Sequence, residues 1–269
     1  MTNLDLFWYF IQERNFIFKR KEAGLPKPWT ADRILQQYKF TNIRRELDTV
    51  SQWVAEEWRL PHQYEDAAWF ACAVSVLSNK VSSMEALGYP VPWNKKHYIE
   101  VMTEHGFGNA YMLTTHRKPI KKPIYYAEIL DYIWNHFSEF HPLANSTLTG
   151  WWNKLVTVDG IAGFIAGQII ASAKHLPAIK TMPDFVTFAA SGPGSRRGLN
   201  RVLHYHVDKT WLEGKWYIAA REVWAQCYGI TGIVMDMQDF QNCLCEFSKY
   251  VRVKNGGYAR NKYDALNQR

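Results

Sequence analysis

The stretch that decides the fold covers residues 148–173 and reads LTGWWNKLVTVDGIAGFIAGQIIASA. Its pattern predicts a helix that ends around residues 156–158, a tight turn over residues 159–163, and a second helix that begins at Phe164. The second helix carries apolar residues at Ile165, Ile169 and Ile170. The stretch therefore predicts a helical hairpin within a mainly α-helical protein.

The turn of this hairpin has the residue types of a phosphate-binding site. Glycine lets the backbone turn tightly and approach a phosphate closely. The free amides at the start of the second helix, aided by the helix dipole, suit phosphate oxygens. Gly160, Ala162 and Gly163 are therefore suited to contact a phosphate. The alternative is an ordinary packing corner, because Gly163 and Gly167 also have the spacing of a close helix–helix contact.

Helical periodicity continues outward from the hairpin along most of the chain. Strand signals are limited to short pieces near residues 110–115 and 230–235, and we find no internal repeat or linker. A single helical domain over residues 1–269 is the simplest prediction. Helices are expected at residues 4–22, 63–79, 125–137, 208–228 and 237–251, with Thr30 or Asp32 capping a short helix that runs through Tyr38, and Asp236 capping the last helix.

Composition excludes several classes of protein. Apolar residues make up 47% of the chain and charged residues 21%, which is a globular composition. The four cysteines lack metal-ligand spacing, so we predict no metal and no cofactor. Asp5 stands where a signal peptide would carry basic residues, and the longest apolar stretch, 160–173, is too short to span a bilayer. We therefore predict a cytoplasmic protein without a membrane partner.

The charge balance points to an anionic partner. The net charge is +7, and the segment 249–269 has six basic residues and one acid, which supplies +5 of it. Such a local excess favours nucleic acid, although a solvated basic tail is the alternative. We expect Lys249 and Arg252 of this segment, together with Arg201, to contact DNA.

A second candidate site lies in residues 189–203, AASGPGSRRGLNRVL. The glycines and the proline predict a flexible turn, and the guanidinium groups that follow suit a phosphate or a pyrophosphate. The stretch has no lysine at the spacing of a nucleotide-binding P-loop. A clamp on the DNA backbone is the competing role. The expected members of this anion cradle are Gly192, Gly194, Ser195, Arg196 and Arg197.

Four stretches together resemble a known family: residues 7–48, the hairpin, SGPGSRRGLNR at 191–201, and residues 244–263. They are similar to the alpha-glutamyl/putrescinyl thymine pyrophosphorylases, also called amino acid:DNA transferases, and to the related helical domain of 5-hydroxymethyluracil DNA kinases. Bacteriophages that hypermodify thymine encode these proteins. The hairpin itself resembles the helix-hairpin-helix element of DNA glycosylases, with departures at Asp159, where proline is commoner, and at Ala162, where a glycine is expected. This resemblance implies that Gly160, Ala162 and Gly163 contact the DNA backbone.

The resemblance implies a fold, a reaction and partners. The implied fold is a helix-hairpin-helix, DNA-glycosylase-like helical domain, in the host cytoplasm if the chain is phage-encoded. The implied reaction replaces the pyrophosphate of pyrophosphorylated 5-hydroxymethyluracil in DNA with the amine of an amino acid or polyamine. The implied partners are double-stranded DNA that carries a modified pyrimidine and a small amine substrate.

The resemblance also suggests roles for single residues. Glycosylases have a catalytic aspartate about two dozen residues after the first hairpin glycine, and Asp184 stands 24 residues after Gly160. Asp184, or in second place Glu46, would take a proton from the amine. The other readings are a helix cap for Asp184 and an ion pair with Arg14 or Arg45 for Glu46. The expected substrate-binding residues are Trp8, Asn42 and Arg45.

Two further functions stay open at this stage. The first alternative is a non-catalytic DNA-binding helical module of a hydroxymethyluracil DNA kinase system. The second alternative is a monofunctional DNA glycosylase. The module would explain the hairpin and the basic segment equally well, but it would not need Asp184. The glycosylase would use Asp184 and would not need Ser195, Arg196 and Arg197.

Overall fold

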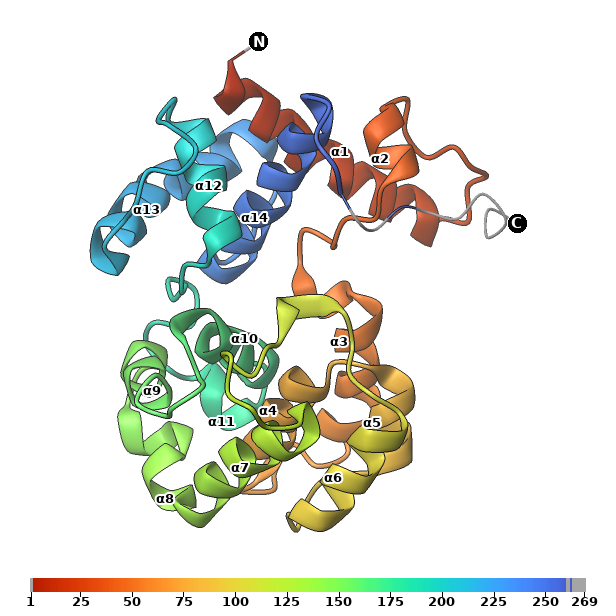
Figure 1. Ribbon diagram of the computed structural model, residues 1–269. Helices are drawn as coiled ribbons and strands as arrows, with labels where there is room; N and C mark the ends of the chain where they lie inside the picture. The colour runs from red at the N-terminus through yellow and green to blue at the C-terminus, as the bar shows by residue number, and fades with distance from the viewer. Residues whose placement is uncertain (1, 260–261, 263–269) are drawn as a thin grey trace. The chain divides into compact units, whose positions relative to one another are not determined.

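The computed structural model describes residues 2–259 and residue 262, and its elements are helices (Figure 1). Within this part of the chain no β-strand forms, and one isolated antiparallel bridge joins Tyr38 to Lys262. The prediction of a mainly α-helical protein is confirmed. The prediction of short strands near residues 110–115 and 230–235 is wrong. A 3₁₀ turn occupies Ala110–Met112, where Tyr111 has φ +63°, and residue 230 belongs to a helix.

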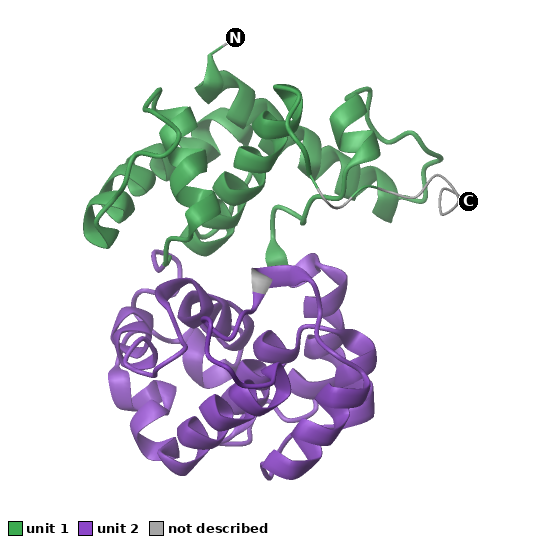
Figure 2. Ribbon diagram, in the orientation of Figure 1, with its two compact units in different colours: residues 1–45, 189–269 green, residues 46–188 purple. Residues whose placement is uncertain are grey.

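The chain divides into two compact units, where the sequence analysis expected one helical domain (Figure 2). Unit 1 combines residues 1–45 and 189–269, so both ends of the chain contribute to it. Unit 2 is the continuous segment 46–188 and contains the hairpin. No helix in the described part of the chain is both long enough and apolar enough to cross a bilayer.

Local signals set where two of the long helices of unit 1 begin. Helix α1 (Asn3–Glu22) begins with a capping box, in which Thr2 Oγ1 accepts the backbone N–H of Asp5 and the Asp5 carboxylate accepts the N–H of Thr2. Helix α14 (Met237–Lys254) begins at Asp236, whose carboxylate accepts a backbone N–H one turn into the helix. The predicted cap at Asp236 is therefore confirmed.

An aromatic core joins the helices of unit 1. The ring of Phe7 lies 5.5 Å from that of Phe240 and 5.0 Å from that of Phe247, and Phe10 lies 5.9 Å from Phe247. Such ring pairs add to the free energy gained by burial alone. The remaining helices of unit 1 are α2 (Arg33–Gln37), which Asp32 caps, α12 (Pro193–Val202) and α13 (Glu213–Thr231).

Unit 2 is built around helix α4 (Ala68–Ser78). Every residue of α4 is buried, as expected for a helix that is apolar on all faces. Its Trp69 meets Trp151 edge to face at a centroid distance of 5.9 Å. The other α-helices of unit 2 are α3 (Thr49–Val54), α5 (Val81–Leu87), α6 (Lys95–Glu104), α7 (Lys122–Asn135), α8 (Phe137–Phe140), α9 (Leu148–Leu155), α10 (Gly163–Ala173) and α11 (Pro177–Lys180). A π-helical turn follows α3 (Ala55–Arg59), and a 3₁₀ turn occupies Pro142–Asn145. A further 3₁₀ turn, Arg45–Leu47, stands where the chain passes from unit 1 into unit 2.

Candidate functional site

The glycine- and arginine-rich stretch in unit 1 is the start of helix α12, which the sequence analysis took for a flexible turn. Pro193 occupies the first helical position, where its fixed φ and missing N–H fit the helix. The N–H of Gly192 donates to Ser195 Oγ at 2.9 Å, and this hydroxyl donates back to the Gly192 carbonyl at 3.1 Å. Ser195 is fully buried, so its hydroxyl serves the helix start and does not face an anion.

Two glycines of α12 serve a close contact with α14. A Cβ atom at Gly194 would overlap the Sγ atom of Cys245, and one at Gly198 would overlap the backbone carbonyl of Leu244. The two glycines are four residues apart, which places them on one face of the helix. Gly194 therefore differs from its expected role, because helix packing and not an anion requires it.

Arg196 is bound within unit 1 at the start of helix α13. Its guanidinium lies 2.8 Å from the Glu213 carboxylate and donates to Ser191 Oγ at 2.7 Å. Ser191 in turn donates its N–H and its hydroxyl to Glu213. This network supplies the guanidinium of Arg196 with hydrogen-bond partners in the absence of a ligand. The role of Arg196 therefore also differs from the one expected in the anion cradle.

Three arginines of unit 1 do come together, and we call Arg197, Arg201 and Arg252 the arginine cluster. Burial, followed by the positive charges of Arg252 and Arg197, lowers the pKa of Arg201, and Asp208 opposes this. Arg197 is half-exposed and lies 3.4 Å from Asp208. Arg201 Nε is buried and finds no hydrogen-bond partner among the described residues. Arg201 thus lies in the field of two other cations and one carboxylate, an arrangement that an anion would stabilise.

The remaining expected ligands of unit 1 have other surroundings. Trp8 is 5% exposed and packs in the aromatic core, so its ring does not line an open pocket. Lys249 lies 2.9 Å from Glu246 and over the ring of Phe40. The backbone carbonyl of Asn42 accepts a hydrogen bond from the Asn242 side chain, and the backbone N–H of Arg45 donates to the Asp239 carboxylate.

Asp184 in unit 2 caps the first helix of the hairpin. One carboxylate oxygen accepts the N–H of Leu148 at 2.7 Å, and the other accepts the N–H and the hydroxyl of Thr149 at 2.9 and 2.8 Å. Negative charge at a helix N-terminus is favourable. The structure therefore supports the helix-cap interpretation of Asp184, with both of its oxygens occupied.

Glu46 is the second expected carboxylate, and it also lies in unit 2. It is half-buried in the 3₁₀ turn Arg45–Leu47 and exerts an electrostatic effect on Arg59. Burial lowers the pKa of Arg59, and the charges of Cys72 and Glu46 oppose that effect. Arg59 itself donates to the carbonyl of Ser172 at 2.9 Å. Arg14, considered as a partner of Glu46, donates instead to the carbonyls of Phe40 and Thr41.

The predicted hairpin is present in α9, α10 and the turn between them. Gly160 has φ +93°, and a Cβ atom there would overlap the Tyr125 hydroxyl and the Ile129 Cδ1 atom. Gly163 packs against Trp152, whose Nε1–H donates to the Gly163 carbonyl at 2.8 Å. Ala162, just before α10, is exposed. Glycine is thus needed in this turn for its backbone conformation and for close packing on α7.

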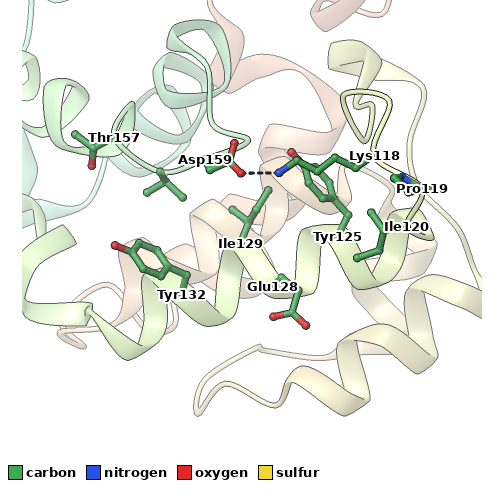
Figure 3. Close-up of a pocket in the computed structure, with 10 residues that line it drawn as sticks. Lys118, Pro119, Ile120, Tyr125, Glu128, Ile129, Tyr132, Thr157 and Asp159 are labelled. Atoms are coloured by element: carbon green, nitrogen blue, oxygen red, sulfur yellow. Dashed lines mark hydrogen bonds and ion pairs between the residues drawn. The ribbon is translucent and has the colours of Figure 1, made fainter.

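A pocket that the sequence analysis missed lies beside this turn (Figure 3). Its volume is about 680 Å³, and it lies among α7, the basic loop 114–121 and the hairpin turn. A signal was available, because Tyr125, Ile129 and Tyr132 lie on one face of a helix. As for a metal, the part of the chain that the structure describes contains no group of three His, Cys, Asp or Glu side chains that could hold one.

The fold and these sites define a helical protein that carries a cationic cluster in one unit and a glycine hairpin beside a pocket in the other. Residues 2–260 match the family described as "5-hmdU DNA kinase, helical domain", and the chain therefore belongs to this family. It is 23% identical over 302 residues to a "5-hmdU DNA kinase" of Bacillus phage SP10. That alignment covers 93% of this chain and 45% of the relative, so the chain spans less than half of the relative's length. No solved structure matches the chain.

Proposed function

We propose that this protein acts in the hypermodification of thymine in phage DNA. The observation that carries the proposal is the family match over residues 2–260, together with the similarity to a phage protein named as a 5-hmdU DNA kinase. The reaction we propose replaces the pyrophosphate of pyrophosphorylated 5-hydroxymethyluracil in DNA with the amine of an amino acid or polyamine. The helix-hairpin-helix, glycosylase-like character of the fold belongs to the same proposal.

The arginine cluster supports binding of a phosphate group. Arg201 is partly desolvated and lies in the field of Arg197 and Arg252. A phosphate or pyrophosphate beside these guanidinium groups would offset their mutual repulsion and accept charge-assisted hydrogen bonds. We assign to this cluster the phosphates of the DNA backbone. The roles first expected of Gly192, Gly194, Ser195 and Arg196 are not part of this assignment, because these residues form the helix start, the helix contact and the Glu213 network.

The proposed reaction needs a group that accepts a proton from the amine. The amine nitrogen forms a bond to the exocyclic methylene carbon of the base as the carbon–oxygen bond breaks, and pyrophosphate leaves with the electron pair. The nitrogen loses a proton to a carboxylate. We place Glu46 in this role ahead of Asp184, because Glu46 accepts no hydrogen bond from the described residues, whereas both oxygens of Asp184 bind donors of the hairpin. Asn42 and Arg45 stay candidates for the amine substrate.

One observation favours a second function. Asp184 acts as a helix cap and Ser195 is buried, so two residues expected in the chemistry have structural roles. A non-catalytic module would need only the hairpin, the arginine cluster and the basic segment. Such a module would bind DNA that carries the modified base and present it to another enzyme.

The test is pyrophosphate release from DNA carrying 5-(pyrophosphoryloxymethyl)uracil, with and without a mixture of amino acids and polyamines. The transferase releases pyrophosphate when the amines are present, and Glu46→Gln abolishes the release while DNA affinity is retained. Glu56→Gln, a change at an exposed glutamate in the same unit, is the matched control. DNA binding without release identifies the module, and appearance of abasic sites identifies a glycosylase.

A further inference from the structure

The pocket beside the hairpin turn, which we call the hairpin pocket, has three walls (Figure 3). Helix α7 forms one wall, the basic loop 114–121 forms another, and the hairpin turn forms the third. Its volume of about 680 Å³ falls within the roughly 300–1,000 Å³ of small-molecule sites. The lining residues that matter here are Lys118, Tyr125, Glu128, Ile129, Tyr132 and Asp159.

The interior of the hairpin pocket is aromatic and aliphatic. Tyr125, Ile129 and Val158 are each no more than 5% exposed and form its inner surface. Tyr132 of the same helix is 48% exposed: its ring packs against that of His136 at a centroid distance of 4.3 Å, and the exposed part of the ring contributes an aromatic surface. Gly160 lies directly against Tyr125 and Ile129, which fixes the hairpin turn over this wall. Such walls suit a flat, largely apolar group.

The charges around the hairpin pocket favour an anionic ligand. Asp159 is paired with Lys118 at 2.5 Å, and Glu128 is paired with Lys95 at 2.8 Å. Each lining carboxylate therefore has a lysine partner, and Lys95 also pairs with Asp131 at 3.2 Å. Arg117 and Lys121 of the basic loop are exposed and add two cations. A nucleotide combines a flat group with negative charge in this way. Its base stacks on aromatic side chains while its phosphates bind cations.

We propose that the hairpin pocket receives an unpaired base of the DNA strand, with Tyr132 as a stacking surface and Arg117 and Lys121 on the neighbouring phosphates. This inference rests on the proposed action on DNA and adds to it a place that holds an unpaired base, separate from Glu46, which is not among the residues that line the pocket. Glycosylases, methyltransferases and deaminases take their target base out of the duplex in this way. The hairpin turn and the basic loop would then hold the strand on both sides of the pocket.

The test compares two DNA duplexes of one sequence, one fully paired and one with a single bulged thymine. The wild-type protein should bind the bulged duplex more tightly. Tyr132→Ala should weaken binding of the bulged duplex by about 5- to 100-fold, the range given by loss of one base–aromatic stack, and leave the paired duplex within about twofold. Thr157→Phe, which fills the pocket from the exposed face of the turn, should do the same.

Two controls separate this inference from the proposed function. Tyr64→Ala removes a tyrosine of the same unit that is 87% exposed and lies outside the pocket, and it should change neither affinity. Arg252→Ala should weaken both duplexes equally. If Tyr132→Ala and Thr157→Phe leave the preference for the bulge intact, the pocket assignment is overturned although pyrophosphate release still supports the function. If the wild-type protein binds neither duplex, both proposals fail.

Discussion

Gly198 of helix α12 lies against the backbone carbonyl of Leu244 in helix α14, with no room between them for a Cβ atom. Backbone cannot move away as a flexible side chain can. This contact therefore makes glycine a requirement of the fold of unit 1, and it keeps Arg197 and Arg201 next to the helix that carries Arg252. The position of the arginine cluster depends on it.

Gly198→Ala should lower the free energy of unfolding by about 1–3 kcal/mol, because overpacking forces the two helices apart. Gly229→Ala, in the neighbouring helix α13, is the matched control, since a Cβ atom there meets nothing within 4 Å. Alanine in that helix should be neutral or stabilise by up to about 1 kcal/mol. Urea unfolding of the two variants checks both values, and an equal effect of the two substitutions would contradict the packing role of Gly198.

Two substitutions at Asp184 separate helix capping from catalysis. An asparagine side chain keeps one acceptor oxygen but turns an NH2 group toward the other donors, so Asp184→Asn should lower stability by up to about 1 kcal/mol, whereas Asp184→Ala loses both acceptors and should cost about 1–2 kcal/mol. Since we assign the proton transfer to Glu46, Asp184→Asn should keep most of the pyrophosphate release. Thermal unfolding and the release assay measure the two effects. Loss of release in Asp184→Asn at unchanged stability would make Asp184 the base.

Arg252→Ala should reduce DNA affinity and its dependence on salt without loss of stability. Each phosphate contact contributes about 0.9 to the slope of log affinity against log salt concentration, so the slope should fall by about 1. The folded state should not suffer, because Arg252 lowers the pKa of Arg201 by repulsion. Arg221→Ala, at an exposed arginine of the same unit, should leave the slope unchanged. Equal slopes for the two variants would contradict the proposal that the arginine cluster contacts DNA phosphates.

His175 should make the folded state sensitive to acid. Burial, followed by the charges of Arg59, Lys174 and Lys180, lowers the pKa of His175 to about 3. Between about pH 6.5 and that value the unfolded chain binds a proton that the folded chain does not, so stability falls as the pH falls, by up to about 1.4 kcal/mol per pH unit. Above about pH 6.5 the contribution of His175 is fully present. His175→Gln should flatten this part of the stability profile, and an unchanged slope would show that His175 does not cause it.

Signals that act over a few residues predicted much of the fold. Asp32 and Asp236 cap helices as expected, and the hairpin has both of its helices. The start of α12 was misread because Gly192, Pro193 and Gly194 suit a turn as well as a helix beginning with proline. The four-residue spacing of Gly194 and Gly198 was the available sign of a close helix contact.

The candidate site was harder to predict because it depends on tertiary contacts. Nothing near Arg196 in the sequence indicates that Glu213, in another helix, occupies its guanidinium. Arg201 and Arg252 belong to distant segments, and sequence analysis selected both without showing that they meet. The hairpin pocket was missed because a loop, a helix and a turn share in forming it.

The most direct test of the central claim is nucleoside mass spectrometry. The purified protein is incubated with DNA carrying 5-(pyrophosphoryloxymethyl)deoxyuridine and a mixture of amino acids and polyamines, and the DNA is then digested and its nucleosides are weighed. Our account predicts a new nucleoside with the mass of thymidine in which one methyl hydrogen is replaced by the amine, and free pyrophosphate in equal amount. An unchanged substrate nucleoside, with DNA binding intact, would contradict the transferase and leave the non-catalytic module.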